Sequence, residues 1–557
     1  MSSDRLIYVP LGGAGEVGMN AYVFGYGPKG RERLILVDLG VTFPDMDSTP
    51  GVDLILPDIG WLADRADRLE AIFITHAHED HVGALGHLWP RLKAPVYARN
   101  FTARIARNKM VEQGQEGAQV KTVGKLPETI EAGPFRVQFF PVSHSLPEAS
   151  GLVIDTPAGR VVHTGDFKVD KTPGVGEPFD PEMLGAIGAD GVKVLVCDST
   201  NVHQPDPGRS ELSLAPALSE LVANTRGMVV ATTFASNVAR LRTLANAGVE
   251  NGRSVCVMGR AMLRMIDTAQ EAGLLTDFPP TINPEEAKSV PRENLMLLVT
   301  GSQGERRAAS AQLSRGTYMG MNMKEGDLFL FSSMTIPGNE RGVIHIANAL
   351  SEMGVDVMDN ASRKYHVSGH PNRPDLEEMH RLMGAPVMIP MHGDHRMLRE
   401  HARLAITSGV RSAVVTNGTM VDLTGAAPQV VDEVPTGRLY LDGNRLVGAM
   451  DGVIRDRIRM ALGGHVLVTL IVDEAGSPLG EAWAETMGLA ENGRGGRSVI
   501  DTLEDEIADF LERADRKTLG DDDKLNDALR RVARQVCMEE LGKRPEITVV
   551  VSRLMDN

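Results

Sequence analysis

A dense group of ionisable side chains directly after an apolar run constrains this chain more than any other feature. The run Ala71–Thr75 predicts a buried strand, and the segment HAHEDH, residues 76–81, follows it at once. Its three imidazoles and two carboxylates are the ligands that zinc or manganese takes in proteins. A lone histidine here would indicate a solvated polar loop. This density of ligands after a strand instead predicts a metal site.

Two single residues further along the chain take the same position after a predicted strand. His144 follows the run Val137–Val142, and Asp166 follows Val161–Thr164 in the sequence HTGD. Either residue alone is more simply a polar turn residue. Together with the HAHEDH segment they would supply the shared ligands that a second metal ion requires. The sequence therefore predicts a two-metal site assembled from strand ends.

The order of the predicted elements indicates several domains. The chain has 557 residues, which at roughly 150 residues per domain suggests three or four domains. Before Ser210, short apolar runs alternate with turns rich in glycine and proline. After Ser210, strands such as Met228–Thr233 alternate with helical segments such as Val238–Ala247, a pattern typical of a largely parallel sheet. A last unit begins with the strand His465–Val472 and continues with two amphipathic helices.

Charge and composition restrict the class of protein. The 58 basic and 74 acidic side chains give a formal charge of −16, which disfavours global attraction to nucleic acid but still allows a local cationic groove or bound metal ions. No apolar run approaches the ~20 residues of a membrane span, and the first residues lack a secretory pattern. The three cysteines are too far apart in sequence for a zinc knuckle. We expect a soluble, cytoplasmic protein without a membrane partner.

Two glycine-rich segments resemble phosphate-binding motifs but lack the context that such motifs need. Gly13–Gly18 is a literal GxGxxG, and Asp38 lies twenty residues beyond it. A dinucleotide site requires a helix that begins at this turn, whereas Ala21–Phe24 predicts a strand. Gly301–Gly304 lacks the GK[ST] ending of a P-loop. We therefore expect a hairpin turn at the first segment. At the second we expect a tight turn, with a phosphate-contacting loop as the less favoured alternative.

The pattern HxHxDH, the later single histidine and the aspartate after a strand resemble the metallo-β-lactamase fold. The resemblance implies an αββα sandwich and two-metal hydrolysis, and it disfavours a serine or cysteine nucleophile. Asp38 ends the predicted strand Leu34–Asp38. It resembles the aspartate that orients metal ligands in this family.

Later motifs narrow the resemblance to the β-CASP group of this fold, which acts on nucleic acid. Cys197–Asn201, His366–His370 and Pro390–Asp394 resemble its acidic motif and its later histidine motifs. With LGGAGEVGMN, HTGDFK, FASN, GSQGE and IPGNE, they resemble the bacterial ribonuclease J family over nearly the whole chain. Asp394 is a small departure, because glutamate is expected there more often.

The resemblance assigns catalytic roles to numbered residues. One zinc or manganese ion would be bound by His76, His78, His144 and Asp166, and the other by Asp80, His81, Asp166 and His392. A hydroxide held between the two ions would be the nucleophile. Asp80, Asp198 and His370 would act in catalysis. His370 would contact the scissile phosphate or protonate the leaving oxygen.

The resemblance also implies RNA contacts and a further cation. The RNA-contacting residues would be His366, Val367, Ser368, Gly369 and His370, joined by Ser236 and Asn237. Local positive charge along the RNA path could come from Arg260, Arg264, Arg306 and Arg307. A peripheral Ca²⁺ or Mg²⁺ would lie at Gly51, Asp53 and Asp442, although ordinary loop acids explain these residues nearly as well.

We therefore expect an α/β protein with four segments. These are a metallo-β-lactamase domain (1–208), an inserted β-CASP α/β domain (209–360), the returning part of the first domain with a linker (361–450), and a small C-terminal α/β domain (451–557). The resemblance implies a two-metal ribonuclease with 5′-to-3′ exonuclease and endonuclease activity, acting in RNA maturation and decay. Its partner would be single-stranded RNA with a 5′ monophosphate, and the chain would form a homodimer or homotetramer.

Three alternatives from other functional classes stay open at this point. A hydrolase of the same fold acting on a small ester or thioester would not need an insertion of roughly 150 residues between Asp198 and His366. A scaffold without metals should show gaps in the ligand set, and every matched position is filled. A β-CASP nuclease that prefers DNA is the hardest to separate, because contacts to the 2′-hydroxyl depend on the shape of the channel.

Overall fold

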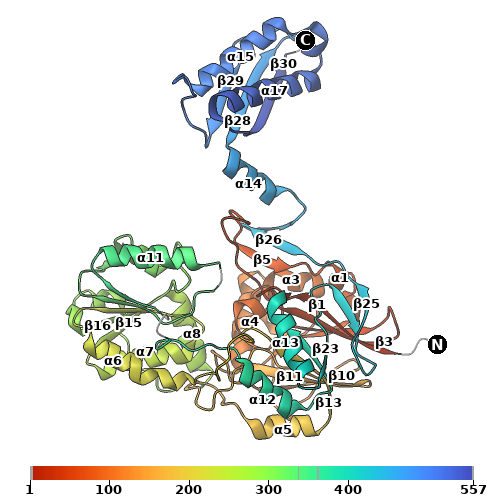
Figure 1. Ribbon diagram of the computed structural model, residues 1–557, viewed down its shortest axis with the longest axis vertical. Coiled ribbons are helices and arrows are strands. Elements are labelled where there is room, and N and C mark those ends of the chain that lie inside the picture. The colour runs from red at the N-terminus through yellow and green to blue at the C-terminus, as the bar shows by residue number, and fades with distance from the viewer. Residues whose placement is uncertain (1–3, 337, 360–362, 555–557) are drawn as a thin grey trace. The chain divides into compact units, whose positions relative to one another are not determined.

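The computed structural model describes residues 4–336, 338–359 and 363–554. The chain divides into two compact units, Met1–Thr42 with Ile55–Arg438, and Phe43–Leu54 with Leu439–Asn557 (Figure 1). The expected domain boundary between residues 360 and 361, and Pro337 of the IPGNE motif, lie outside the described residues. Among the described residues, no helix has the length and apolar character needed to cross a membrane.

Two β-sheets form the centre of the first unit. One has the strand order β25–β24–β1–β3–β4–β6–β7–β8, and the other has the order β23–β21–β13–β12–β11–β10–β9. The first sheet consists of β1 (Arg5–Gly12), β3 (Ala21–Gly27), β4 (Arg33–Val37), β6 (Leu69–Phe73), β7 (Val96–Ala98), β8 (Val120–Thr122), β24 (Thr419–Asp422) and β25 (Gln429–Glu433). The second consists of β9 (Ile130–Ala132), β10 (Phe135–Pro141), β11 (Ser150–Thr156), β12 (Gly159–His163), β13 (Val192–Asp198), β21 (Val387–Met391) and β23 (Arg411–Ser412).

The main core lies between these sheets because successive side chains of a strand point to opposite faces. In β13, Val194 and Val196 belong to the core shared with the first sheet, whereas Leu195 and Cys197 face the helices on the other side. Those helices are α5 (Pro181–Ala189), α12 (Arg373–Met383) and α13 (His395–Thr407). Beside the first sheet, α3 (Leu85–Leu92) packs on α4 (Asn100–Glu112), and α4 contacts β7 and β8. The predicted αββα sandwich is confirmed.

A separate parallel sheet is inserted between β13 and α12. Its strand order is β15–β16–β14–β19–β20, with every neighbouring pair parallel. The strands are β14 (Val229–Thr232), β15 (Ser254–Met258), β16 (Leu295–Val299), β19 (Leu328–Phe331) and β20 (Asp356–Met358), accompanied by α6 (Ala215–Asn224), α7 (Val238–Glu250), α8 (Arg260–Glu271) and α11 (Glu340–Glu352). All of β16 is buried, as expected for a strand covered on both faces. The predicted alternation of strands and helices after Ser210 is confirmed.

The C-terminal part of the second unit is a small fold in which two helices pack on a three-stranded sheet. Strand β28 (His465–Val472) pairs with β29 (Trp483–Met487) and with β30 (Glu546–Arg553). Alternate β28 side chains are buried in a core with α15 (Val499–Arg513) and α17 (Asp522–Leu541). Helix α14 (Val453–Gly463) precedes this fold along the chain. These elements confirm the two predicted amphipathic helices.

The GxGxxG segment does not begin a helix. Strand β1 ends at Gly12, Ala14–Gly15 forms a short strand, and β3 returns antiparallel to β1. Its three glycines adopt positive φ angles, which a glycine turn permits. The turn places Asn20 beside Asp80. The carbonyl oxygen of Asp80 accepts hydrogen bonds from both the backbone and side-chain nitrogens of Asn20. The hairpin interpretation is confirmed, and the segment supports the site described next.

Candidate metal centre

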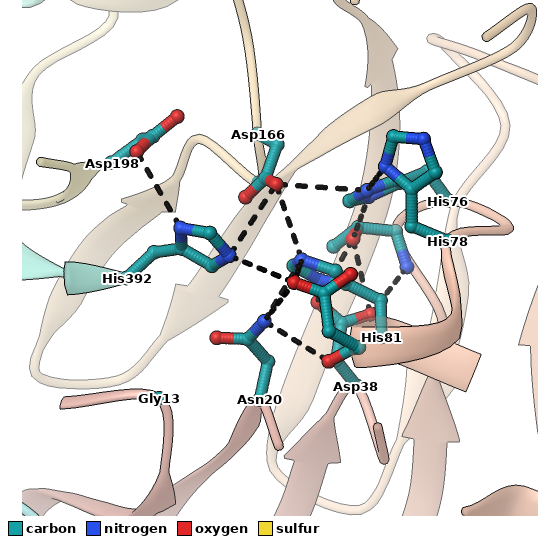
Figure 2. Close-up of polar contacts among 12 residues, drawn as sticks. Gly13, Asn20, Asp38, His76, His78, His81, Asp166, Asp198 and His392 are labelled. Atoms are coloured by element: carbon teal, nitrogen blue, oxygen red, sulfur yellow. Dashed lines mark hydrogen bonds and ion pairs between the residues drawn. The ribbon is translucent and has the colours of Figure 1, made fainter. Parts of the chain in front are cut away.

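The predicted ligands converge at one edge of the sandwich because each follows the end of a strand. His76 and His78 follow β6, and α2 (Glu79–Val82) holds Asp80 and His81. His144 follows β10, Asp166 follows β12 and His392 follows β21. Figure 2 shows His76, His81 and His392, which come from separate segments, around Asp166.

Four side chains form the first group. The ligand atoms of His76, His78, His144 and Asp166 all lie within 4.8 Å of one another. Nδ1 of His78 is 3.1 Å from Nε2 of His76 and 3.1 Å from Nε2 of His144. These ring nitrogens therefore surround a common point.

The second group shares Asp166 with the first. Ligand atoms of Asp80, His81 and His392 lie within 4.8 Å of one another. Oδ2 of Asp166 is 3.2 Å from Nε2 of His81 and 3.6 Å from Nε2 of His392. The same oxygen is 3.7 Å from Nε2 of His76. One carboxylate oxygen thus lies between the two histidine groups, as the predicted bridging role requires.

The electrostatics of the two groups differ. Burial lowers the pKa of His76 and His144 well below the usual range, and it lowers that of His78 to about 4. In the second group burial acts the same way, but Asp166 and other carboxylates outweigh it and raise the pKa of His392 to about 9. Burial alone would raise the pKa of Asp166, but His392 and His81 hold it well below its ordinary value. The first group therefore holds neutral imidazoles, whereas the imidazoles of the second group carry protons that a bound metal ion would displace.

The outer nitrogen of each histidine tests whether this donor set fits a metal. A metal-bound histidine normally donates its other ring N–H to an acceptor. His81 Nδ1 is 2.8 Å from Oδ2 of Asp38, and His144 Nδ1 is 2.6 Å from the carbonyl oxygen of Gly369. Corresponding acceptors for the outer nitrogens of the remaining rings are Thr75 Oγ1 for His76, Ser145 Oγ for His78 and Thr200 Oγ1 for His392. The inner nitrogens face the site and are the atoms that would bind a metal ion.

A second observation supports the fit. Oδ1 of Asp166 is buried and has no hydrogen-bond partner, a costly arrangement for an ionised carboxylate unless a cation compensates it. Neutral imidazoles and carboxylates are suitable ligands for zinc and for manganese. The residues present therefore fit divalent metal ions.

Asp38 organises two of the histidines at once. It follows β4 with a positive φ angle of 62° and is fully buried. Its carboxylate accepts hydrogen bonds from the backbone nitrogen and the hydroxyl of Thr75, at 2.7 and 2.8 Å. Since the Thr75 hydroxyl donates to Asp38, it accepts from His76. Asp38 thus fixes His81 directly and His76 through Thr75.

Asp198 and His370 form a pair beside the second group. His370 Nδ1 lies 2.8 Å from Oδ2 of Asp198 and 3.8 Å from Oδ2 of Asp166. Burial lowers the pKa of His370, but Asp198 and Asp166 outweigh it and raise that pKa above its usual value. The Thr200 hydroxyl donates to Oδ1 of Asp198 at 2.8 Å and lies 2.7 Å from Nδ1 of His392. Asp198 therefore contacts His370 directly and His392 through Thr200.

The segment 366–370 is tied to the centre at several points. Besides the contact between Gly369 and His144, the Ser368 hydroxyl accepts hydrogen bonds from the backbone nitrogen of His370 and from the side chain of Asn201. His366 and Val367 are buried. His366 Nδ1 lies 3.3 Å from the guanidinium of the buried Arg240, and the carbonyl oxygen of His366 accepts a hydrogen bond from Arg209. The inserted domain therefore contacts this loop through two arginines.

The other residues predicted to contact RNA lie outside the segment 366–370. Asn237 caps α7 by accepting a hydrogen bond from the backbone nitrogen of Arg240, and Ser236 is half-buried beside it. Of the four candidate arginines, Arg264 pairs with Glu112, and Arg260, Arg306 and Arg307 are exposed.

The three residues of the expected peripheral cation site lie in the second unit. The carboxylate of Asp442 pairs with Arg457, and Asp53 accepts a hydrogen bond from the backbone nitrogen of Gly443. The guanidinium of Arg457 also approaches Gly51. A positive side chain therefore already faces this cluster.

The sequence reasoning missed four residues that orient the centre, namely Asn20, Thr75, Thr200 and Asn201. Asn20, Thr200 and Asn201 lie inside motifs that were recognised, and Thr75 ends the predicted strand before His76. Their orienting role was missed because polar residues are common at any turn.

Comparisons with known families agree with this architecture. The chain matches the descriptions "Metallo-beta-lactamase superfamily" over residues 14–220, "Ribonuclease J, beta-CASP domain" over 226–350, "Zn-dependent metallo-hydrolase RNA specificity domain" over 340–415 and "Ribonuclease J C-terminal domain" over 452–554. A crystal structure of a protein of unknown function from Enterococcus faecalis V583 shares the fold over 75% of this chain and 100% of its own, with a TM-score of 0.51 and 17% identity. The fold and the site define a metal-dependent hydrolase with domains for RNA.

Relatives of nearly full length narrow this class. The chain is 40% identical to ribonuclease J of Sinorhizobium meliloti over 99% of this chain and 98% of that one. It is 35% identical to ribonuclease J of Mycolicibacterium smegmatis over 97% and 96%, and 34% identical to that of Thermus thermophilus over 85% and 83%. The chain belongs to the ribonuclease J family. It is a metal-dependent ribonuclease of RNA processing.

Proposed function

We propose that this chain is a two-metal ribonuclease that degrades RNA from a 5′-monophosphorylated end in the 5′-to-3′ direction and also cuts internally. The observation that carries the two-metal part is the position of Asp166. Its Oδ2 lies within 4 Å of the Nε2 atoms of His76, His81 and His392, which belong to two separate groups. A shared carboxylate is what a pair of adjacent ions needs.

The proposed ligands are those the sequence assigned. His76, His78, His144 and Asp166 would hold one ion, and Asp80, His81, Asp166 and His392 the other. Zinc is favoured by the number of imidazoles, with manganese as the alternative. Two such ions supply Lewis-acid charge at a scissile phosphate and activate the attacking water.

The chain's own residues would place the reacting groups. Asp198 holds Nδ1 of His370 at 2.8 Å, which leaves Nε2 of His370 as the ring nitrogen free to carry a proton to a leaving oxygen or to contact the phosphate. Asp80 would contribute to catalysis as a ligand near His392, whose Nε2 is 3.2 Å from its carboxylate. The RNA would contact the segment 366–370, with Ser236 and Asn237 further along its path.

The preference for a 5′ monophosphate and the mixed cleavage mode rest on the family to which the chain belongs. The same proposal divides the chain into the four segments 1–208, 209–360, 361–450 and 451–557. It also includes assembly as a homodimer or homotetramer and a peripheral Ca²⁺ or Mg²⁺ in the second unit. The proposed location is the cytoplasm. The three cysteines are free and buried, in keeping with a reducing compartment.

The test is a digest of three end-labelled substrates. They are one RNA with a 5′ monophosphate, the same RNA with a 5′ triphosphate, and the matching DNA. The expected result is rapid shortening of the monophosphorylated RNA from its 5′ end, slower or internal cutting of the triphosphate, and little action on DNA. The double variant His76→Ala, Asp80→Ala should be inactive, whereas the exposed His345→Ala on α11 should keep full activity.

Each other outcome removes part of the proposal. Equal rates on both RNA ends would remove the monophosphate preference. Faster cutting of DNA would favour a DNA nuclease. A wild type that binds metal yet cuts no nucleic acid would remove the nuclease itself.

A further inference from the structure

A second cluster of metal-ligating side chains lies away from the catalytic residues. Cys197, His380 and His401 each offer one ligand atom, and these atoms all lie within 4.8 Å of one another. The three residues come from β13, α12 and α13. They share no member with the groups around Asp166, so this cluster is a separate feature.

The cluster is enclosed by the apolar core beneath the helices. Cys197 and His401 are completely buried, and His380 is 8% exposed. Cys197 belongs to the core that β13 forms with α12 and α13, on the face of the strand opposite Val196. Buried polar groups in such a core need partners, because an unmet donor or acceptor costs about 1–3 kcal/mol.

Hydrogen bonds do not give every polar atom of the cluster a partner. Nε2 of His380 lies 3.0 Å from Nε2 of His401, and the two rings are parallel, with an interplanar angle of 2°. Nδ1 of His401 is occupied by the hydroxyl of Ser199 at 2.9 Å. Nδ1 of His380 is buried without a partner. A proton shared between the rings explains their approach, and the Cys197 thiol has a side-chain contact with Thr164. Neither contact explains why a thiol and two imidazoles gather in one apolar core.

A metal ion would use one ligand atom from each of the three residues. One nitrogen of each ring and the sulfur lie within 4.8 Å of one another, and a thiolate with imidazoles is a donor set that suits zinc. Burial keeps both imidazoles unprotonated near neutral pH, since it lowers the pKa of His380 to about 4 and that of His401 well below its usual value. On binding, the Cys197 thiol would release its proton to solvent.

We propose that Cys197, His380 and His401 bind one divalent transition-metal ion, with zinc the best match, at a structural site distinct from the catalytic centre. The ion would join β13 to α12 and α13 directly behind Asp198 and Ser199. Because Ser199 contacts His401, the site would also steady the strand end that carries Asp198.

Cobalt gives a test that the catalytic centre cannot imitate. The catalytic groups contain only histidine and aspartate, whereas a thiolate bound to Co²⁺ adds an intense charge-transfer absorption in the near ultraviolet. The full-length protein would be stripped of metal with a chelator and titrated with CoCl₂. We expect this absorption in the wild type, its loss in Cys197→Ala, and its retention in the matched control Cys256→Ala, a buried free cysteine on β15.

Two further readouts keep the test decisive. If Cys197→Ala fails to fold, His380→Gln serves instead, and it should shift or abolish the band while the weaker visible bands of the catalytic centre persist. Bound zinc, measured by mass spectrometry under native conditions, should fall by one equivalent per chain in the Cys197 or His380 variant. No charge-transfer band in the wild type, or a band that survives Cys197→Ala, would overturn the proposal.

Discussion

The carbonyl oxygen of Gly369 accepts a 2.6 Å hydrogen bond from Nδ1 of His144. This contact joins the loop before α12 to a ring that belongs to the first group of the metal centre. It fixes the proton of His144 on the outer nitrogen and so leaves Nε2 for a metal ion. A residue expected to contact RNA is therefore also part of the support of the metal site.

Gly369→Ala should weaken metal binding. A Cβ at this position would lie 2.9 Å from Cε1 of His144 and 3.1 Å from its Nδ1, closer than side chains normally approach. The ring would have to move, and loss of such an outer contact typically lowers metal affinity about 10–100-fold. Competition with a chromophoric chelator measures this directly. Gly185→Ala on α5, whose Cβ would meet its nearest neighbour at 3.9 Å, is the matched control and should bind metal normally.

Asp38→Asn should impair both histidines that Asp38 orients. The amide can present only one acceptor oxygen, whereas the carboxylate holds His81 with one oxygen and Thr75 with both. We expect metal affinity to fall about 10–100-fold, with ribonuclease activity restored by excess metal. The exposed Asp190→Asn should leave both properties unchanged. Normal metal content in Asp38→Asn would contradict the orienting role.

Thr200 should act through its hydroxyl alone. It lies between Oδ1 of Asp198 and Nδ1 of His392, at 2.8 and 2.7 Å. Thr200→Val preserves shape but removes the hydroxyl, so we expect kcat to fall about 10–100-fold with little change in the KM for RNA. Thr200→Ser retains the hydroxyl and should recover most of kcat. Equal kcat in the valine and serine variants would show that the hydroxyl does not contribute to kcat.

The sequence predicted the residues that converge at this centre but not the residues that orient them. His76, Asp166 and His392 were predictable because each follows an apolar run, and strand ends meet at one edge of a sheet. Thr200 and Asn20 act through hydrogen bonds to residues distant in the chain, and polar residues at turns are too common to mark such contacts. The sequence of helix α4 also shows no clear hydrophobic periodicity, because its buried face includes the small residues Ala103 and Ala106.

The buried pair of Arg240 and Glu211 should dominate the stability of the inserted domain. Arg240 is completely buried and donates to both carboxylate oxygens of Glu211 and to the carbonyl oxygen of Ser332. Glu211→Gln leaves the guanidinium without its counter-charge, which typically costs about 3–5 kcal/mol. Urea denaturation followed by circular dichroism measures this loss.

Matched variants show whether the loss of stability comes from leaving a charge buried without its partner. Glu112→Gln removes the partner of the exposed Arg264 and should cost no more than about 1 kcal/mol. The double variant Arg240→Met, Glu211→Leu should be less destabilised than Glu211→Gln, because no unpaired charge stays buried. Similar losses for the buried and exposed pairs would contradict this account.

His163 should make stability depend on pH between about 6.5 and 5. Its ring is completely buried near Tyr22 and Phe24. Its Nδ1 accepts a hydrogen bond from the backbone nitrogen of Gly165. Burial lowers its pKa to about 3, so below pH 6.5 the unfolded chain takes up a proton that the folded chain does not. Stability therefore falls as the pH falls, by about 2 kcal/mol at pH 5 from this residue.

The measurement is the free energy of unfolding at a series of pH values for the wild type and for His163→Asn. Asparagine keeps an acceptor near Gly165 but does not titrate, so its slope against pH should be smaller by up to about 1.4 kcal/mol per pH unit. The variant will be less stable at neutral pH because the smaller side chain leaves a cavity, but a cavity shifts the curve without changing its slope. The exposed His345→Asn provides the comparison for losing a histidine at the surface. An unchanged slope in His163→Asn would show that this ring is protonated in the folded protein, and that its burial does not oppose the charge.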